Sequence, residues 1–188
     1  MKRNVTLVST SILGALVFLF DYTLKFSGLK IPFPLLPALK FDLTGIPIVL
    51  STLMFNLPSG ATTSAIAFLA ILLRSGNIVD TSMKALAEFM TVLGIAPLMK
   101  RTDRVGRSLA IILGLSLRIV TMSIANVIIL PIMYPNSYAS SLAAVSFLPF
   151  LGIFNLIQGS ISIVGGFLIY EAVTRRLAFM NILTTEKP

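Results

Sequence analysis

The chain has 188 residues, of which 56% are hydrophobic and 12% are charged, and its mean hydropathy is +0.95. This composition lies far from that of a soluble globular domain and predicts an integral membrane protein. The sequence contains no Cys and no His, which excludes thiol chemistry, disulfides, Ser-His catalysis and zinc or haem ligation by His. The net charge of +8 comes from basic residues at the ends of apolar runs, so it does not indicate a nucleic-acid-binding surface.

The length accommodates about six membrane-spanning helices, because each needs about 20 mainly apolar residues. We therefore expect a single all-α transmembrane domain over residues 1–188. The first apolar run, residues 5–20, lacks the small-x-small cleavage site of a signal peptide and predicts an uncleaved first helix. Residues 21–42 are polar and Pro-rich and predict a long first extracellular loop.

Five further helices follow in chain order, with Thr44 as a possible N-cap of the first and Pro131 ending the fourth. They are predicted at residues 44–56, 59–74, 80–98, 108–130 and 149–175. The predicted inner segments are richer in basic residues: Lys2, Arg3, Lys100, Arg101, Arg104, Arg107, Arg175, Arg176 and Lys187, against Lys25, Lys30, Lys40 and Arg74 outside. The positive-inside rule then puts both termini in the cytoplasm of a multi-pass plasma-membrane protein.

Two ionisable residues, Glu88 and Arg118, fall near the middle of predicted spans at similar depths. Each costs at least about 2.5–3.5 kcal/mol to insert, so each is expected to face a cavity or a partner. An ion pair between them is geometrically allowed. Such a pair either clamps two helices together or contributes to a ligand site.

Three amide side chains, Asn126, Asn155 and Gln158, lie in the outer halves of the last two predicted helices. Asn155 and Gln158 are three residues apart and share a helix face. Amides in a membrane either hold helices together or bind the polar edge of a heterocycle. Together with Glu88, they predict a pocket that opens to the outside.

Small residues recur at four-residue spacing in the first predicted helix, as Thr10 with Gly14 and Ser11 with Ala15. This spacing lets another helix approach closely, either within the same bundle or from a partner subunit. The sequence has no Walker A motif, which excludes the usual route of ATP hydrolysis, and no carboxylate cluster that suggests a metal site.

Residues 31–47, IPFPLLPALKFDLTGIP, resemble the first loop and second helix of the S components of energy-coupling factor (ECF) transporters. The match is to the riboflavin-specific group, and residues 154–159, FNLIQG, resemble a second motif of that group. Tyr170 and the Arg175-Arg176 pair fit its cytoplasmic end. Ile153, Gln158 and Gly45 depart from the group, which has Pro, Lys and an acidic residue there.

This resemblance implies a six-helix subunit that binds riboflavin from outside, without a cofactor, a metal or catalysis. The first loop is then expected to cap the pocket with apolar contacts from Leu35, Leu36, Leu39 and Phe41, while Asn155 and Gln158 donate or accept hydrogen bonds. It also implies docking through Thr10, Ser11, Gly14 or Ala15 onto a membrane-embedded coupling (T) subunit, which two ATPase subunits drive.

Alternatives remain open from the sequence. Another vitamin or precursor, such as a pantothenate-like or pyrimidine-like compound, is compatible with the same fold. A stand-alone carrier that uses Glu88 as a proton site is a second possibility. An intramembrane enzyme is a third, although the sequence lacks a reactive constellation.

Overall fold

The computed structural model describes residues 2–99, 101, 103–133 and 145–185. This part of the chain contains six α-helices, one short 3-10 turn and a two-stranded antiparallel hairpin. The helices are α1 (Lys2–Phe26), α2 (Gly45–Met54), α3 (Leu57–Ser75), α4 (Ile78–Ile95), α5 (Arg104–Met133) and α7 (Leu148–Thr185). The hairpin strands are β1 (Ile31–Phe33) and β2 (Leu36–Phe41), and the 3-10 turn is η1 (Ala96–Leu98).

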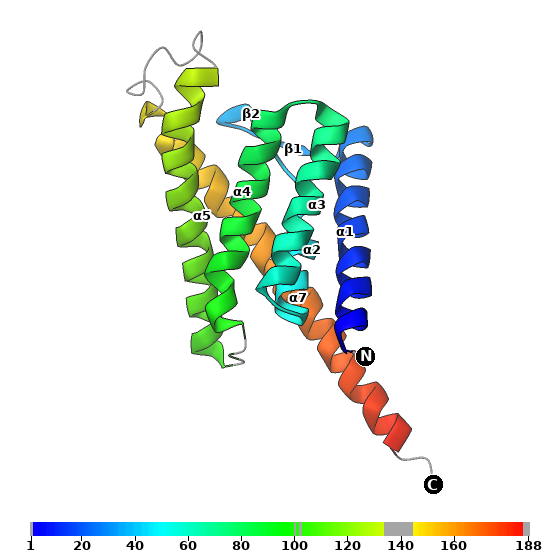
Figure 1. Cartoon of the computed structure of the whole chain (residues 1–188). Coiled ribbons are helices and arrows are strands. Elements are labelled where there is room, and N and C mark those ends of the chain that lie inside the picture. The colour runs from blue at the N-terminus through cyan, green and yellow to red at the C-terminus, as the bar shows by residue number, and fades with distance from the viewer. Residues whose placement is uncertain (1, 100, 102, 134–144, 186–188) are drawn as a thin grey trace.

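The helices form a bundle in which α1, α3, α4 and α5 stand side by side, and α7 crosses them obliquely (Figure 1). Helix α7 packs on α2 and α5, while α1 packs on α3. Both termini lie at one end of the bundle, and the hairpin lies at the other end (Figure 1). This arrangement agrees with an even number of crossings, while the orientation in the membrane stays a prediction.

Within the described residues, four helices are long and apolar enough to cross a membrane: α1, α3, α5 and α7. Helix α2 has only 10 residues, and α4 carries Asp80, Lys84 and Glu88 at four-residue spacing. Large apolar side chains such as Leu73 and Ile124 are exposed, whereas Glu88 and Arg118 are buried. The molecule therefore presents apolar side chains outward and encloses charged ones, as a membrane solvent requires.

The segment predicted as one long loop, residues 21–42, is more ordered than its prolines suggested. Helix α1 continues to Phe26 rather than ending at Phe20, so Asp21 lies inside it. The rest of the segment forms the hairpin, in which Pro32 pairs with Lys40. Proline is tolerated here because a two-stranded ribbon has only edge strands, on which an N–H can point away from the ladder.

Other helix ends also differ from the prediction: α5 begins at Arg104 rather than at 108, and α7 continues to Thr185 rather than ending at 175. Helix α4 begins at Ile78, because the side chain of Asn77 accepts hydrogen bonds from the backbone N–H groups of Val79 and Asp80 and so caps the helix. Helix α5 continues through Pro131 to Met133.

Close helix contact at the centre depends on two glycines. A Cβ on Gly94 of α4 would lie 2.7 Å from the Cα of Gly114 on α5. These glycines allow the two backbones to touch. Helices α4 and α5 therefore form a tightly packed pair.

Candidate ligand-binding site

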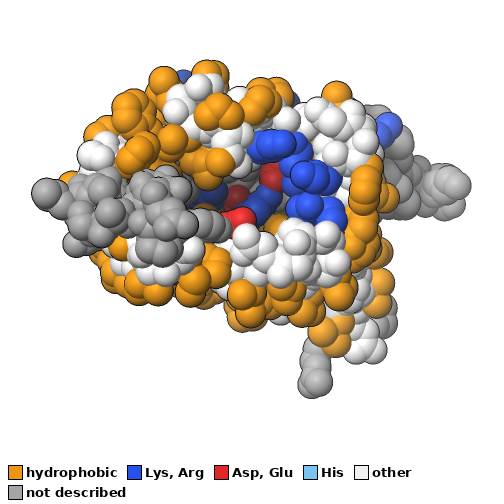
Figure 2. All heavy atoms as spheres, turned by 90° about the horizontal axis from the view of Figure 1, so that it is seen from above, with side chains coloured by type: hydrophobic (Ala, Val, Ile, Leu, Met, Phe, Trp, Pro, Cys, Tyr) orange, Lys and Arg blue, Asp and Glu red, His pale blue; other side chains and the backbone are white. Residues whose placement is uncertain are grey.

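A cavity of about 520 Å³ lies at the hairpin end of the bundle. Four segments line it: strand β2, the first half of α4, the second half of α5 and the start of α7. Figure 2 looks onto this end and shows a hollow in which Lys, Arg, Asp and Glu side chains gather, surrounded by apolar atoms. Its volume falls within the range of about 300–1,000 Å³ that is typical of small-molecule sites.

The floor of the cavity holds an ion pair. Glu88 Oε1 lies 3.0 Å from Arg118 Nη1, so the pair that the sequence allowed does form. Arg118 also donates from Nη1 to Thr91 Oγ1 (3.1 Å) and from Nε to Asn155 Oδ1 (3.2 Å). Its guanidinium therefore links α4, α5 and α7 beneath the cavity.

Glu88 lines the cavity, and its carboxylate is buried at the floor. Both oxygens are fully buried, and neither accepts a well-aligned hydrogen bond from the described residues, although Oε1 is within ion-pair distance of Arg118. Oε2 lies at the first turn of α2, where a Cβ on Gly45 would overlap it and Ser162 Oγ. A helix N-terminus favours a negative charge at this position. The geometry thus favours the clamp over direct ligand contact.

The three amides predicted to converge all line this cavity. Both polar atoms of the Gln158 amide form hydrogen bonds with the backbone of Asp42. Oε1 accepts from its N–H (3.1 Å), and Nε2 donates to its carbonyl (3.0 Å). Asn155 accepts from Arg118 and donates to the Leu151 carbonyl (2.9 Å). Asn126 Nδ2 donates to the carbonyl of Met122. Gln158 therefore joins α7 to the stem of the hairpin.

Asp42, directly after β2, is the residue at which the hairpin is fastened to the bundle. Its buried carboxylate pairs with Lys84 of α4 and lies 3.5 Å from Lys30 Nζ. It also accepts hydrogen bonds from the backbone N–H and the hydroxyl of Thr44 (3.1 and 2.7 Å). Backbone and side chain of Asp42 together therefore hold the hairpin stem to α4, α7 and the start of α2.

A second buried carboxylate extends this network to α1 and α3. Asp21 of α1 pairs with Lys30, which precedes β1, and with Arg74 at the end of α3. Burial lowers the pKa of Lys30, and its contact with Asp21 opposes that shift. Both ends of the hairpin are thus anchored by ion pairs.

An aromatic cluster forms a further contact between the hairpin and α7. The ring centroids of Phe33 and Phe154 are 5.7 Å apart, and those of Phe41 and Phe154 are 5.1 Å apart with nearly parallel planes. Phe154 lines the cavity, and Phe33 and Phe41 pack behind it. This wall of the cavity is aromatic and apolar.

Of the four loop residues that were predicted to contact a ligand, two line the cavity and two do not. Leu36 and Leu39 line the cavity. Phe41 belongs to the aromatic cluster behind it, and Leu35 is 53% exposed at the hairpin turn, outside the lining. Sequence reasoning did not identify Lys84, which lines the cavity; its four-residue spacing from Asp80 and Glu88 was the signal that could have found it.

The two small-residue pairs of α1 face different ways. Thr10 and Gly14 are buried, and a Cβ on Gly14 would overlap the side chain of Ile66 on α3. Ser11 and Ala15 are exposed on the outer face of α1. The first pair therefore packs within the bundle, and only the second is available to another subunit.

Across the described ranges, no three His, Cys, Asp or Glu side chains lie close enough to hold a metal ion.

No protein-family model matches the sequence, and no curated protein matches it. A solved structure of the S component of a bacterial ECF transporter matches with a TM-score of 0.76, covering 93% of this chain and 98% of that chain at 22% sequence identity. The chain therefore has the fold of an ECF S component.

Proposed function

We propose that this chain is the substrate-binding subunit of an ECF-type vitamin importer. The observation that carries the proposal is the meeting of its two sequence motifs at one cavity. Residues 31–47 and 154–159 are far apart in the chain, yet Gln158 binds the backbone of Asp42, 116 residues away, and both motifs supply lining residues. The shared fold with an S component supports the same reading.

The proposed ligand is riboflavin. The aromatic wall made by Phe154 and the rings behind it suits contact with a planar ring system. Leu36 and Leu39 supply apolar contacts from the hairpin, and Asn126 supplies a polar group from α5. An apolar pocket with few polar groups is what a heterocyclic vitamin requires.

The proposed topology has six crossings, with both termini in the cytoplasm and the cavity open to the outside of the plasma membrane. A membrane-embedded coupling subunit and two ATPase subunits supply the energy for inward delivery. The chain itself only binds, and it carries out no covalent chemistry. Asn155, Gln158 and Glu88 serve the site by fixing its walls, as their internal contacts indicate.

The test is titration of the detergent-purified chain with riboflavin, read by quenching of flavin fluorescence. Saturable quenching near a single equivalent, or a yellow preparation, is the expected result. Leu39→Ala should weaken binding because Leu39 lines the cavity, whereas Leu35→Ala is the matched control on the exposed turn. A colourless protein that does not bind flavin would show that riboflavin is not the ligand. The same titration with pantothenate-like and pyrimidine-like compounds would then identify the ligand class.

A stand-alone proton-coupled carrier is the rival function. It requires Glu88 to exchange a proton with the cavity, yet both carboxylate oxygens are buried and Oε1 lies 3.0 Å from Arg118 Nη1. Uptake into proteoliposomes under a proton gradient, without ATPase subunits, would establish this rival. Uptake that requires the ATPases and ATP would exclude it.

A further inference from the structure

Five charged side chains at the hairpin end form one linked network, and their charges do not cancel. Asp21 pairs with Lys30 and Arg74, while Asp42 pairs with Lys84 and lies 3.5 Å from Lys30 Nζ. Three cations therefore share two carboxylates, and none of the five side chains is more than 24% exposed. A buried charge without a counter-charge is costly, so one further anion would stabilise this network.

The excess charge faces the candidate vitamin site through Lys84. Of the five side chains, that of Lys84 alone lines the cavity under the hairpin. Within the described residues its ammonium donates one hydrogen bond, to the Asp42 carboxylate, although an ammonium can donate three. Lys84 can therefore bind a second acceptor from inside the cavity.

The remaining charged residues of the lining do not offset this excess. Glu88 pairs with Arg118, and Asp80, one turn before Lys84, accepts a hydrogen bond from Asn77. Lys40 of β2 is exposed, and its ammonium has no ion-pair partner in the described ranges. Network and lining together hold five cations against four carboxylates, and Figure 2 shows more Lys and Arg than Asp and Glu surface in the hollow.

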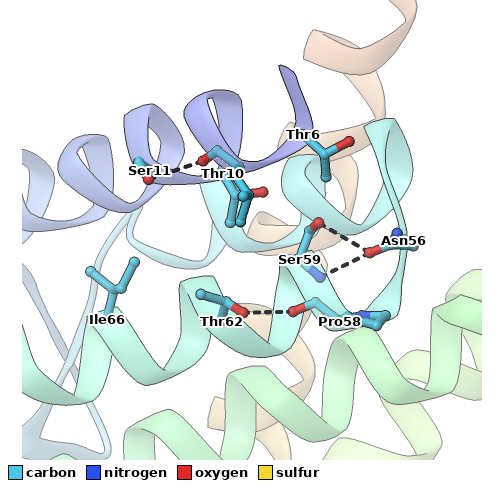
Figure 3. A pocket seen from close by; sticks show the side chains of 9 residues that line it. Thr6, Thr10, Ser11, Asn56, Pro58, Ser59, Thr62 and Ile66 are labelled. Atoms are coloured by element: carbon cyan, nitrogen blue, oxygen red, sulfur yellow. Dashed lines mark hydrogen bonds between the residues drawn. The ribbon is translucent and has the colours of Figure 1, made fainter. Parts of the chain in front are cut away.

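A second cavity of the same chain has a different character. It measures about 420 Å³, lies between α1 and α3, and has no charged residue in its lining (Figure 3). The hydroxyls of Ser59 and Thr62 in this lining already donate to Asn56 Oδ1 and to the Pro58 carbonyl. The excess positive charge is thus a feature of the cavity under the hairpin.

We propose that the ligand of the hairpin-end cavity carries an anionic group, a phosphate ester or a carboxylate, which the ammonium of Lys84 binds, with Lys40 as a further cation of the lining. The inference rests on the proposed function and narrows its ligand class to the anionic form of a vitamin. The anionic group supplies the missing negative charge, and charge-assisted hydrogen bonds are stronger than those between neutral groups. The rest of the ligand then lies against Leu39 and Phe154, which line the same cavity.

The test compares two pairs of ligands whose members differ in one charged group. The phosphate ester of riboflavin and riboflavin itself form one pair, and pantothenate and its alcohol analogue panthenol form the other. Isothermal titration calorimetry of the detergent-purified chain should favour the anionic member of the pair that binds by about tenfold or more. A smaller difference, or a preference for the neutral member, would overturn the inference.

Lys84→Met tests which residue carries the preference, because methionine keeps much of the length and removes the charge. The ratio of the two affinities within the pair should fall toward one. A hairpin loosened by the lost contact with Asp42 would weaken both members alike, so an unchanged ratio would contradict the role of Lys84. Lys40→Met breaks no ion pair of the described residues and should lower the ratio by about twofold to fivefold, as expected for an exposed charge. The matched control is Lys25→Met, on an exposed lysine of α1 outside the lining, which should leave the ratio unchanged.

The outcome also separates this inference from the function on which it rests. If both members of a pair bind equally well, the inference is wrong and the proposed function stands. If neither member of either pair binds, the proposed function is contradicted and the inference fails with it. The comparison of ligand pairs uses the wild-type chain, so it does not depend on the folding of any variant.

Discussion

Replacing Gln158 with Leu should loosen the hairpin while leaving the helices intact. The substitution removes two hydrogen bonds, one to the backbone N–H and one to the carbonyl of Asp42. Each is worth about 0.5–1.5 kcal/mol, so the pair contributes about 2 kcal/mol to the closed position of the hairpin. Since 1.4 kcal/mol corresponds to about a factor of ten, the open population should rise about 30-fold.

Hydrogen–deuterium exchange of a peptide covering residues 31–42 measures this change directly. We expect exchange there to accelerate by about the same 30-fold factor in Gln158→Leu and vitamin dissociation to accelerate with it. Ser160→Ala, two residues along the same helix, is the control, because its hydroxyl bonds only to its own helix. Unchanged exchange in residues 31–42, combined with lost binding, would show that Gln158 contacts the vitamin instead and would refute this reasoning.

Three further predictions concern the floor and wall of the cavity. Arg118→Met should lower the free energy of unfolding, measured in detergent, by about 3–5 kcal/mol because it leaves Glu88 buried without its partner. Adding Glu88→Gln to this variant should restore part of the loss, and additive losses would contradict the pairing. Gly45→Ala should lower the unfolding temperature, measured by the same method, because its methyl group would overlap Ser162 Oγ. Phe154→Leu should weaken flavin binding about threefold to tenfold in fluorescence titration through lost stacking, and unchanged affinity would place the ring system elsewhere.

The helices were predictable because the membrane imposes a simple pattern on the sequence. Apolar runs interrupted by Pro, Gly and basic residues predicted the first residue of all six described helices to within four residues. Two caps differ from the prediction: Asn77 rather than Asp80 accepts the N–H groups of α4, and Thr44, at the N-cap position of α2, makes no side-chain cap hydrogen bond. Glu88 and Arg118 were found for the same reason: a charge within an apolar run needs a partner.

The hairpin and the contacts of the amides were not predictable in the same way. A short ribbon rich in proline carries little periodic signal, and the bonds that fix it come from residues distant in sequence, such as Gln158 on Asp42. Amide side chains have no sequence signature that separates a ligand contact from an internal one. The sequence placed Asn155 and Gln158 at the cavity, and the structure adds that both use donors and acceptors within the chain.

The ionisable residues of α4 indicate where the cavity ends inside the bundle. Asp80, Lys84 and Glu88 follow one another at single-turn intervals, and their exposure decreases along the helix: Asp80 is exposed, the Lys84 side chain is 24% exposed, and that of Glu88 is 1% exposed. Such a row cannot face lipid, so it fixes which side of α4 borders the cavity. Because the Glu88 oxygens are closed off by Arg118 and the start of α2, the accessible space ends above them. The cavity therefore ends at this floor, and a ligand of the proposed function would lie above it, in the space that Leu39 and Phe154 line.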